Sequence, residues 1–272
     1  MHQTYSIEVL ANPGLTMGKD EATALQDALC HLGALCLRPF PKYQVLDKSS
    51  PTALNDKLIV VARYDGQIIA FLSAVWLPIT TLDRPLLHSG LTVIHPAYRS
   101  SGISLDLFAH LFLHLISNHP EGLWMSTLAT VISSLVNMSK YTTQVFPSPE
   151  WSSLHPAGQP SSQHLAIARE ISANHRDKML VSPGAVFDED AFVFRDSRNP
   201  GQGEAFWKDV DDQTYWHRDR EASMFFRKLL RPNTGDEVLQ ISFLDPKHIA
   251  EHSESQRFAQ KYSAKVAKVV SL

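Results

Sequence analysis

The sequence predicts a mixed α/β (α+β) fold in which helices cover a mixed sheet. Two observations predict it. Of the 272 residues, 44% are hydrophobic, which is enough to fill a sizeable core. The hydrophobic residues also recur with two different periods, about two residues in some segments, as in strands, and about 3.6 in others, as in helices. Strands and helices therefore alternate along the chain.

The first strand and the first helix are predicted near the N-terminus. Residues 5–10 alternate like a half-buried strand, and Asn12-Pro13-Gly14 then ends the strand. Hydrophobic residues recur at helical spacing over residues 19–37, so this segment predicts an amphipathic helix. Pro39 and Pro41 follow it, and proline has no backbone N–H with which to continue a helix.

A β-hairpin is predicted next. The segments 58–64 and 67–75 are rich in β-branched and other apolar residues, as strands are. They flank Asp65-Gly66, a dipeptide that suits a two-residue type I′ turn because both of its central positions need a positive φ.

A strand and a helix then occur twice in succession. Residues 86–94 predict a strand, which His95-Pro96 closes, and a helix of about 17 residues begins near Gly102. Apolar side chains cover much of this helix, so we expect it to be buried on most sides. Residues 123–129 predict the next strand, and residues 133–143 a shorter helix.

A change in composition marks a boundary. Residues 147–162 are rich in Pro and Ser, which predicts a linker or a long surface loop. We therefore expect a first domain at 1–147, a Pro/Ser-rich linker at 148–162 and a mixed α/β C-terminal extension at 163–272. In the extension, helices are predicted at about 163–176 and 218–230, and strands at 178–181, 191–195 and 238–244.

A polar turn between the strand at 86–94 and the following helix has the chemistry of a phosphate site. At a helix N-terminus several backbone N–H groups lack partners, and the helix dipole places positive charge there. Arg99 can add a bidentate contact, Gly102 leaves room for a pyrophosphate, and Ser100, Ser101 and Ser104 add hydroxyl donors. The alternative is a simple N-cap without a ligand, since serine is a common cap.

The run of residues 91–104 resembles the central motif of the GNAT (GCN5-related N-acetyltransferase) superfamily. In that motif a hydrophobic strand with V-x-P-x-[YF] leads into [QR]-x-x-G-x-[GA], and here Ser104 replaces the final Gly or Ala. The predicted order of elements over residues 5–147 also resembles the GNAT core. The resemblance implies an acyl-CoA N-acyltransferase fold with acetyl-CoA, or another acyl-CoA, as co-substrate. The extension's helix and strand order is compatible with a second, degenerate GNAT-like half.

The resemblance also implies roles for individual residues. The backbone of Thr92, Val93 and Ile94 would pair with the pantetheine arm, and the N–H groups from Ser100 to Ser104, with Arg99, would hold the pyrophosphate. Tyr141 falls where many family members have the tyrosine that protonates the departing thiolate. The implied coenzyme A-binding residues are Thr92, Val93, Ile94, Arg99, Ser100, Ser101, Gly102, Ile103, Ser104 and Ser134, the last at a position where an Asn is usual.

A general base is harder to assign. The strand at 86–94 contains no carboxylate, and in much of the family a Glu on this strand or its neighbour serves as the base. His88 is the predicted base, because the pKa of histidine lies near neutrality. Proton transfer through water, a base from the C-terminal part, or a purely structural histidine at a strand start are the alternatives.

The predicted function is transfer of an acetyl or other acyl group from coenzyme A to an amine of a small molecule. One alternative is a GNAT-shaped protein that binds an acyl thioester or another ligand without transferring it. Another is a GNAT-like malonyl-thioester decarboxylase, in which His88 would act with Thr92 or Thr127.

Composition excludes several other classes. The net charge of −3 shows no basic excess, so we expect no nucleic-acid partner. We expect no membrane association and a cytoplasmic location, because the sequence shows no long apolar run and no signal-peptide pattern at its start. We expect no metal, since Cys30 and Cys36 lack the spacing of a zinc knuckle, and His110 and His114 lack the intervening Glu of a zincin.

Overall fold

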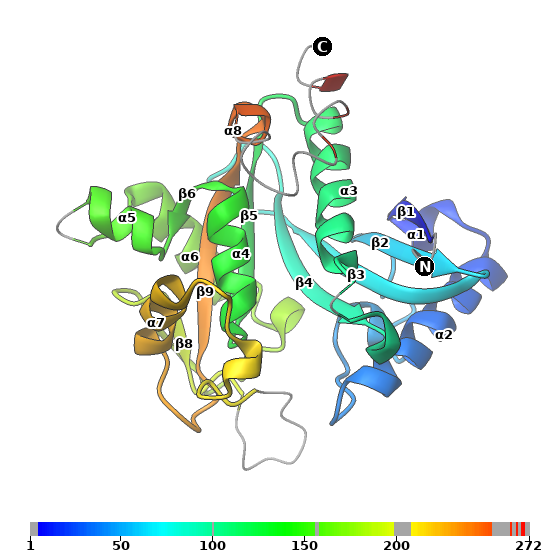
Figure 1. The fold of residues 1–272 in the computed structure, drawn as a ribbon, viewed down its shortest axis with the longest axis horizontal. Helices are drawn as coiled ribbons and strands as arrows, with labels where there is room; N and C mark the ends of the chain where they lie inside the picture. The colour runs from blue at the N-terminus through cyan, green and yellow to red at the C-terminus, as the bar shows by residue number, and fades with distance from the viewer. Residues whose placement is uncertain are drawn as a thin grey trace. The chain divides into compact units, whose positions relative to one another are not determined.

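The predicted mixed α/β fold is confirmed in a computed structural model of the chain (Figure 1). The structure describes residues 5–99, 101–155, 158–198 and 208–251, together with residues 262, 265, 268 and 269. The chain forms two compact units. The first unit comprises Met1–Trp76, Ser89–Gly122 and Pro246–Leu272, and the second comprises Leu77–His88 and Leu123–Asp245.

The first unit is built on an antiparallel hairpin and the strands beside it. Its strands follow one another across the sheet in the order β1 (Ser6–Ala11), β2 (Lys57–Tyr64), β3 (Gln67–Leu77) and β4 (Leu86–Ile94). The last residue of β3, Leu77, and the first three of β4, Leu86–His88, are assigned to the second unit. β1 pairs antiparallel with β2, and β2 pairs antiparallel with β3. At the hairpin, φ is 49° at Asp65 and 75° at Gly66, so both central residues have the positive φ that a type I′ turn needs. The predicted hairpin is confirmed.

Two long helices cover the faces of this first sheet, and the unit also contains two short helices. The long helices are α2 (Lys19–Cys36) and α3 (Ile103–Asn118), and the short ones are α1 (Pro13–Thr16) and α8 (Pro246–Glu251). α2 and α3 lie on opposite faces of the sheet (Figure 1). α3 is buried on most sides, as predicted, because its apolar residues extend around its circumference. Two 3-10 turns, η1 (Gln44–Leu46) and η2 (Pro96–Tyr98), shape the loops near β4.

The second unit contains an antiparallel sheet built around β9 (Glu237–Leu244). On one edge β9 pairs with β5 (Leu123–Ala129) over residues 238–244. On its other edge β9 pairs with β6 (Thr143–Phe146) near one end and with β8 (Val193–Arg195) near the other, and β7 (Val186–Asp188) follows β8.

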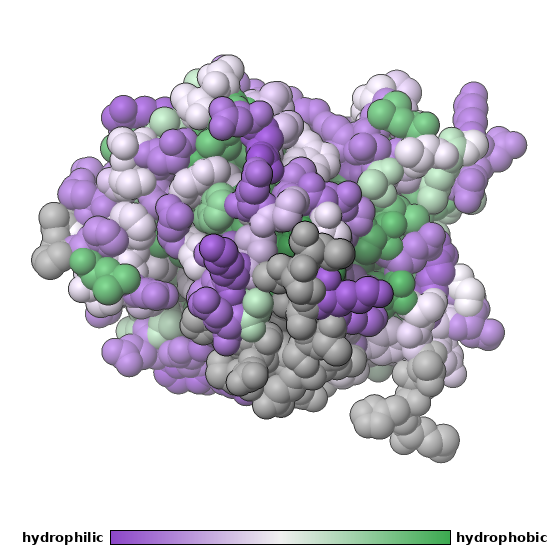
Figure 2. All heavy atoms as spheres, turned by 90° about the horizontal axis from the view of Figure 1, so that it is seen from above, coloured by the Kyte–Doolittle hydropathy of each residue, from purple (hydrophilic) through white to green (hydrophobic). Residues whose placement is uncertain are grey.

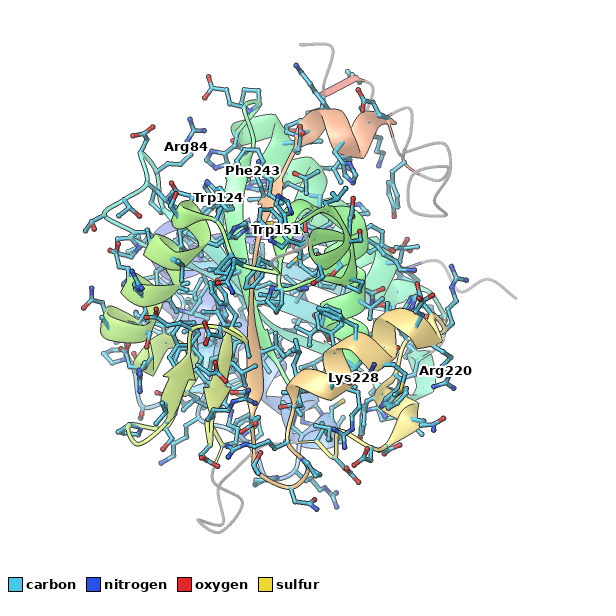
Figure 3. The ribbon with its side chains drawn as sticks, turned by 90° about the vertical axis from the view of Figure 1, so that its left-hand side faces the viewer. Arg84, Trp124, Trp151, Arg220, Lys228 and Phe243 are labelled. Atoms are coloured by element: carbon cyan, nitrogen blue, oxygen red, sulfur yellow. The ribbon has the colours of Figure 1, made fainter. Side chains whose placement is uncertain are left out.

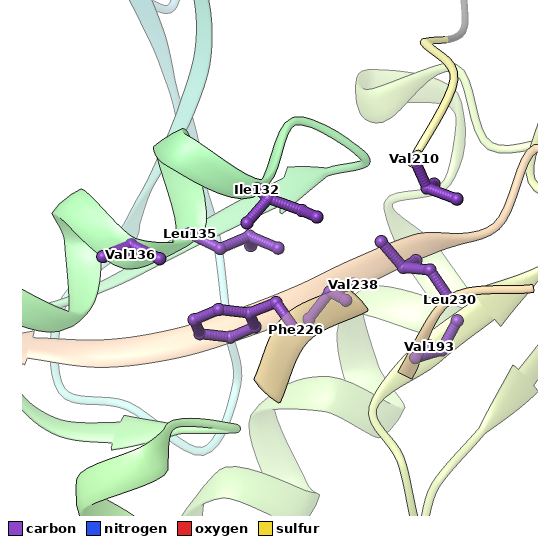
Figure 4. Close-up of a cluster of buried hydrophobic side chains, with 8 residues drawn as sticks. All are labelled: Ile132, Leu135, Val136, Val193, Val210, Phe226, Leu230 and Val238. Carbon is purple, nitrogen blue, oxygen red and sulfur yellow. The ribbon is translucent and has the colours of Figure 1, made fainter. Parts of the chain in front are cut away.

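The helices of the second unit are amphipathic and pack by their apolar stripes. They are α4 (Ile132–Tyr141), α5 (Pro149–Leu154), α6 (Ser162–Asn174) and α7 (Arg220–Leu229), with the 3-10 turns η3 (Asp177–Met179) and η5 (Gln213–Tyr215). α4 and α7 enclose a hydrophobic cluster with β8 and β9, drawn in Figure 4, in which the ring of Phe226 is fully buried. Burial of such a cluster supplies much of the stability of a small unit.

An aromatic cluster occupies another part of this unit. Trp124, Trp151 and Phe243 lie near one another (Figure 3), and the buried ring of His164 lies edge-on to both tryptophans, at 5.5 Å from Trp124 and 4.8 Å from Trp151. His164 Nε2 donates to the Gln144 carbonyl oxygen at 2.7 Å, so this histidine is a hydrogen-bonded core residue.

The segment between β3 and β4 belongs to the second unit, and hydrogen bonds to α6 and to the residue after it hold it there. The backbone N–H and the hydroxyl of Thr80 donate to the carboxylate of Glu170 on α6, at 2.7 and 2.9 Å. His175 Nε2 donates to the Pro78 carbonyl oxygen at 2.9 Å.

Most predicted elements are found within two or three residues of their predicted ends, and the exceptions have local causes. The strand predicted at 178–181 is wrong: η3 occupies part of it, and Leu180 takes a left-handed φ of 57° that a strand does not allow. Part of the predicted linker is the helix α5, because Ser148 caps it and Pro149 takes its first position, where proline is tolerated.

The two compact units do not divide at the predicted linker. β9, from the predicted extension, pairs with β5 and β6 from the predicted first domain, so residues on both sides of 148–162 form one sheet. Pairing of strands distant in sequence has no local signature, which is why composition alone suggested another boundary.

The face of the molecule drawn in Figure 2 is mostly polar. The face drawn in Figure 2 carries chiefly hydrophilic side chains, with hydrophobic ones singly or in small groups. Such isolated exposed hydrophobics are ordinary for a protein surface. Within the described ranges, the helices are each too short or too polar to cross a bilayer.

Candidate functional site

The predicted phosphate site lies in the turn between β4 and the N-terminus of α3. β4 ends at Ile94, and His95 Nδ1 accepts a hydrogen bond from the Ala97 N–H at 3.2 Å, which starts the turn η2. Gly102 is the N-cap of α3 in a left-handed conformation, with φ 89° and ψ 2°. A glycine N-cap has no side chain to occupy the N–H groups of Ile103 and Ser104, to which an anion can bind at a helix start, whereas the Leu105 N–H donates to the Gly102 carbonyl oxygen at 3.0 Å.

Space is open at the same position. A Cβ added to Gly102 would meet no other atom within 4 Å. Arg99 and Ser101 are exposed, Ser104 is half-buried, and Ser100 lies outside the described residues. Ser101 Oγ donates to the Tyr98 carbonyl oxygen at 2.6 Å, which stabilises the turn.

Ile103 has a different role from its neighbours in the turn. Its side chain is only 1% exposed, so it anchors the start of α3 in the core and can offer only its backbone N–H to a ligand.

Arg99 lies next to the end of α2. Its guanidinium interacts with the thiol of Cys36, and Cys36 Sγ donates to the Ile94 carbonyl oxygen at 3.3 Å. Burial raises the pKa of the Cys36 thiol, and the positive charge of Arg99 partly opposes this increase. The thiol therefore stays protonated at neutral pH and packs against the turn.

β4 presents two different faces to its surroundings. Leu91 and Val93 are buried, whereas Thr92 between them is exposed and Ile94 is half-buried. Successive side chains of a strand point to opposite faces, so Thr92 and Ile94 share the more open face. The three predicted pantetheine-pairing residues, Thr92 to Ile94, thus immediately precede the turn on one strand.

A buried carboxylate, which the sequence analysis missed, holds the first turn of α3. Asp106 is 4% exposed and accepts hydrogen bonds from the Tyr5 hydroxyl at 2.5 Å and the Tyr262 hydroxyl at 3.0 Å. Burial, together with the charge of Asp106, raises the pKa of both phenols, so both remain donors. The available signal was a single acidic residue in the first turn of an otherwise apolar helix, where the helix dipole favours a negative charge.

His88 lies in the second unit and is fully buried. Its Nδ1 is 2.9 Å from Ser126 Oγ, within hydrogen-bond distance. Burial, with a further contribution from the charge of Arg198, lowers the pKa of His88 to about 3, so the imidazole is neutral at physiological pH. An efficient general base has a pKa near the working pH, and this environment does not favour that role. The assignment of His88 as base stays a prediction.

Tyr141 and Ser134 are also in the second unit, on one helix. They are seven residues apart on α4, about two helical turns, so they share one side of it. Ser134 is exposed and Tyr141 is half-buried. Burial raises the pKa of Tyr141, and the nearby charge of Arg218 only partly opposes this, so the phenol keeps its proton at neutral pH, as an acid must.

Charged groups surround the end of α4. Lys140 Nζ donates to the Asp219 carboxylate at 2.8 Å, which ties α4 to the start of α7. His217 Nδ1 accepts from the Asp219 N–H at 3.0 Å, so its neutral form carries the proton on Nε2.

Side chains that could bind a metal ion were considered over all the described residues. Among the described residues, no group of three His, Cys, Asp or Glu side chains is arranged to hold an ion. The ring of His110, one of the two helix histidines considered above, bonds through Nδ1 to the Asp106 carbonyl oxygen at 2.9 Å.

Comparison with known proteins gives matches only among solved structures. No family model and no curated protein matches the sequence. One matching structure is an aminoglycoside acetyltransferase from an uncultured soil metagenomic sample, in complex with sisomicin. It is 17% identical, with a TM-score of 0.29, and the match covers 39% of this chain and 66% of that one, just under two thirds.

Two further structures have similar scores. A GNAT family acetyltransferase from Brucella melitensis, in complex with acetyl-CoA, is 15% identical over 46% of this chain and 76% of that chain, with a TM-score of 0.34. An acyl-CoA N-acyltransferase from Pseudomonas aeruginosa is 17% identical over 51% of this chain and 82% of that chain, with a TM-score of 0.35.

All three of these proteins are named as acetyltransferases or acyltransferases. The predicted order of elements from β1 to α4 is present in the structure. At these identities and scores the comparison assigns no residue a role, so each role depends on the chain's own geometry.

Proposed function

We propose that the protein binds an acyl-coenzyme A, with acetyl-CoA as the donor, and transfers the acyl group to an amine of a small molecule. The observation that carries the proposal is the left-handed Gly102 at the start of α3, directly after β4 and beside the exposed Arg99. Backbone N–H groups at a helix start and the helix dipole favour an anion such as a pyrophosphate, and Arg99, three residues before Gly102, can add a charge-assisted contact.

The other binding roles are those that the resemblance of residues 91–104 implies. The backbone of Thr92, Val93 and Ile94 would hydrogen-bond the pantetheine arm, and the N–H groups of residues 100–104 would hold the pyrophosphate. Ser134, on α4, would be a further binding residue.

The reaction itself needs one proton removed and one supplied. The neutral amine attacks the thioester carbonyl carbon, the C–S bond breaks, and coenzyme A leaves as a thiolate. Tyr141, kept protonated by its partly buried environment, would donate its proton to that thiolate. We propose that the proton of the attacking amine is passed to water, since His88 is buried and its pKa is low.

Two features favour a second candidate, a protein that binds the thioester without transferring it. β4 has no carboxylate, and its histidine is poorly suited as a base. Such a protein would bind acyl-CoA through the same turn and show no turnover.

Calorimetric titration with CoA, acetyl-CoA and malonyl-CoA tests the binding step. Arg99→Glu replaces a charge-assisted donor with a repelling carboxylate, so we expect affinity to fall about ten- to a hundredfold. Arg220→Glu is the control, because it makes the same charge change on the exposed side of α7 (Figure 3). No binding of CoA to the natural protein, or equal affinity in the two variants, would contradict the proposal.

Turnover separates a transferase from a binding protein. We expect thiol release from acetyl-CoA to accelerate with members of a panel of small amines. Tyr141→Phe should lower kcat by about 100-fold or more and leave CoA affinity unchanged, because the phenol would act only on the leaving group. An unchanged kcat would show that Tyr141 is not the acid. Release of CO₂ from malonyl-CoA would instead identify a decarboxylase.

A further inference from the structure

The side chain of Gln44 takes the place of a side chain in the middle of β4. The strand has a glycine there, Gly90, and a Cβ added to it would lie 2.1 Å from Gln44 Nε2 and 2.4 Å from Oε1. No side chain could grow from position 90 without displacing the amide. Gln44 therefore lies directly against the backbone of β4.

Hydrogen bonds hold this amide in place. The fully buried Ser73 on β3 donates to Gln44 Oε1 at 2.8 Å, and Gln44 Nε2 donates to the Tyr43 hydroxyl at 2.9 Å. Because both its oxygen and its nitrogen are hydrogen-bonded, the Gln44 amide has a defined position. We call this fixed amide, which lies against Gly90, the wall.

The loop that carries Gln44 is also anchored. Val45 and Leu46 are buried at 0% and 2% exposure, and the Gln26 side chain on α2 donates to the carbonyl oxygens of Val45 and Asp47, each at 3.2 Å. Gln44 itself has a φ of 49°, a left-handed conformation that is unfavourable for a residue with a side chain. Strained residues held by their surroundings cluster at ligand sites.

The length of the pantetheine arm places the acyl group near this wall. The arm contains about thirteen main-chain atoms, which is about the length of four residues of extended chain, or roughly 13 Å. An arm whose pyrophosphate end lies level with Ile94, where β4 meets the turn, and that runs back along β4 therefore ends close to Gly90, four residues earlier at about 3.3 Å each. Gly90 and Thr92 share the more open face of the strand, because they are two residues apart.

We infer that Gln44 closes the acyl end of the thioester site, so that the protein accepts short acyl groups such as acetyl and excludes longer chains. The inference rests on the proposed function, since it takes the acyl-CoA to lie along β4. A longer acyl chain would have to displace the amide and break its bonds to Ser73 and Tyr43. The acyl chain length is therefore selected by one side chain.

The test compares the affinities of CoA, acetyl-CoA, butyryl-CoA and hexanoyl-CoA by calorimetry. Gln44→Gly removes the wall and suits the left-handed backbone, and Gln44→Ala removes the same atoms with a different backbone preference. Gln144→Gly is the matched control, because Gln144 is an exposed glutamine with the same φ of 49° in the second unit.

We expect the natural protein and Gln144→Gly to bind hexanoyl-CoA at least about tenfold more weakly than acetyl-CoA, and Gln44→Gly to lose most of this difference. The affinity for CoA itself should be the same in all of them. If CoA binds but the natural protein shows no preference for acetyl-CoA, or Gln44→Gly and Gln44→Ala keep that preference, the inference about Gln44 is wrong and the proposed function stands. If CoA does not bind the natural protein, both are wrong.

Discussion

Three glycine substitutions separate backbone strain from ligand binding at the turn before α3. Gly102 has a φ of 89° and Gly66, in the hairpin, a φ of 75°, whereas Gly18, the N-cap of α2, has a φ of −63°. None of the three would bring a new Cβ within 4 Å of another atom. Replacement by alanine therefore causes no clash at any of them, and only the backbone conformation distinguishes them.

This difference in backbone conformation sets the expected changes in the free energy of unfolding and in Tm. A non-glycine residue in the left-handed region costs about 1–2 kcal/mol, so Gly102→Ala and Gly66→Ala should each lower the free energy of unfolding by that amount. The corresponding decrease in Tm is a few degrees for a chain of this size. Gly18→Ala should change neither quantity measurably.

Of the three glycine variants, only Gly102→Ala should lower the affinity for coenzyme A. In Gly102→Ala the N–H groups of the turn change direction, and the loss of one charge-assisted hydrogen bond costs about 1.5–3 kcal/mol, or about ten- to a hundredfold in Kd. Thermal unfolding and calorimetric titration with CoA measure the two effects on the same samples. If Gly102→Ala binds CoA as well as Gly66→Ala does, the turn does not hold the pyrophosphate.

Two further predictions concern the stability of the second unit. Burial would raise the pKa of Asp236, but hydrogen bonds, chiefly from Arg231 and also from Arg195, outweigh burial and lower it. A carboxyl whose pKa is lowered by folding contributes stability that is complete above the ordinary aspartate pKa, near 3.8 here, and is lost as the pH falls below it. Asp236→Asn should therefore cost about 3 kcal/mol in urea unfolding at pH 7, and less at pH 3; an equal loss at both pH values would argue against this role. Phe226→Ala should cost about 3–5 kcal/mol by leaving a cavity between α4 and α7, whereas Met224→Ala, exposed on the same helix, should be nearly neutral; similar losses would contradict the packing account.

Local chemistry explains what could be predicted without coordinates. The hairpin at Asp65-Gly66 and the glycine at the start of α3 each depend on a few adjacent residues and their backbone preferences. The same holds for β4 and β5, whose predicted and observed ends coincide at 86–94 and 123–129. The candidate phosphate turn was visible for this reason, since strand, turn and helix are contiguous in the chain.

Contacts between distant residues explain what could not be predicted. His88 looked like an accessible base in sequence, and only the packing around it and Ser126, 38 positions later, shows that it is buried and neutral. Tyr5 and Tyr262 reach Asp106 across 101 and 156 positions. No periodicity or motif encodes such pairs.

The sequence by itself determined the mixed α/β fold, the positions of the longer helices and strands, and the turn at Arg99–Ser104, because periodicity, glycine and proline act within a few residues. Only the tertiary structure decided how the chain divides into compact units, which histidine is buried, and that Gln44 lies against Gly90. The physical reason is that burial, pKa and steric exclusion depend on neighbours in space. Folding brings those neighbours together from positions far apart in the sequence, and no local sequence pattern predicts their contact.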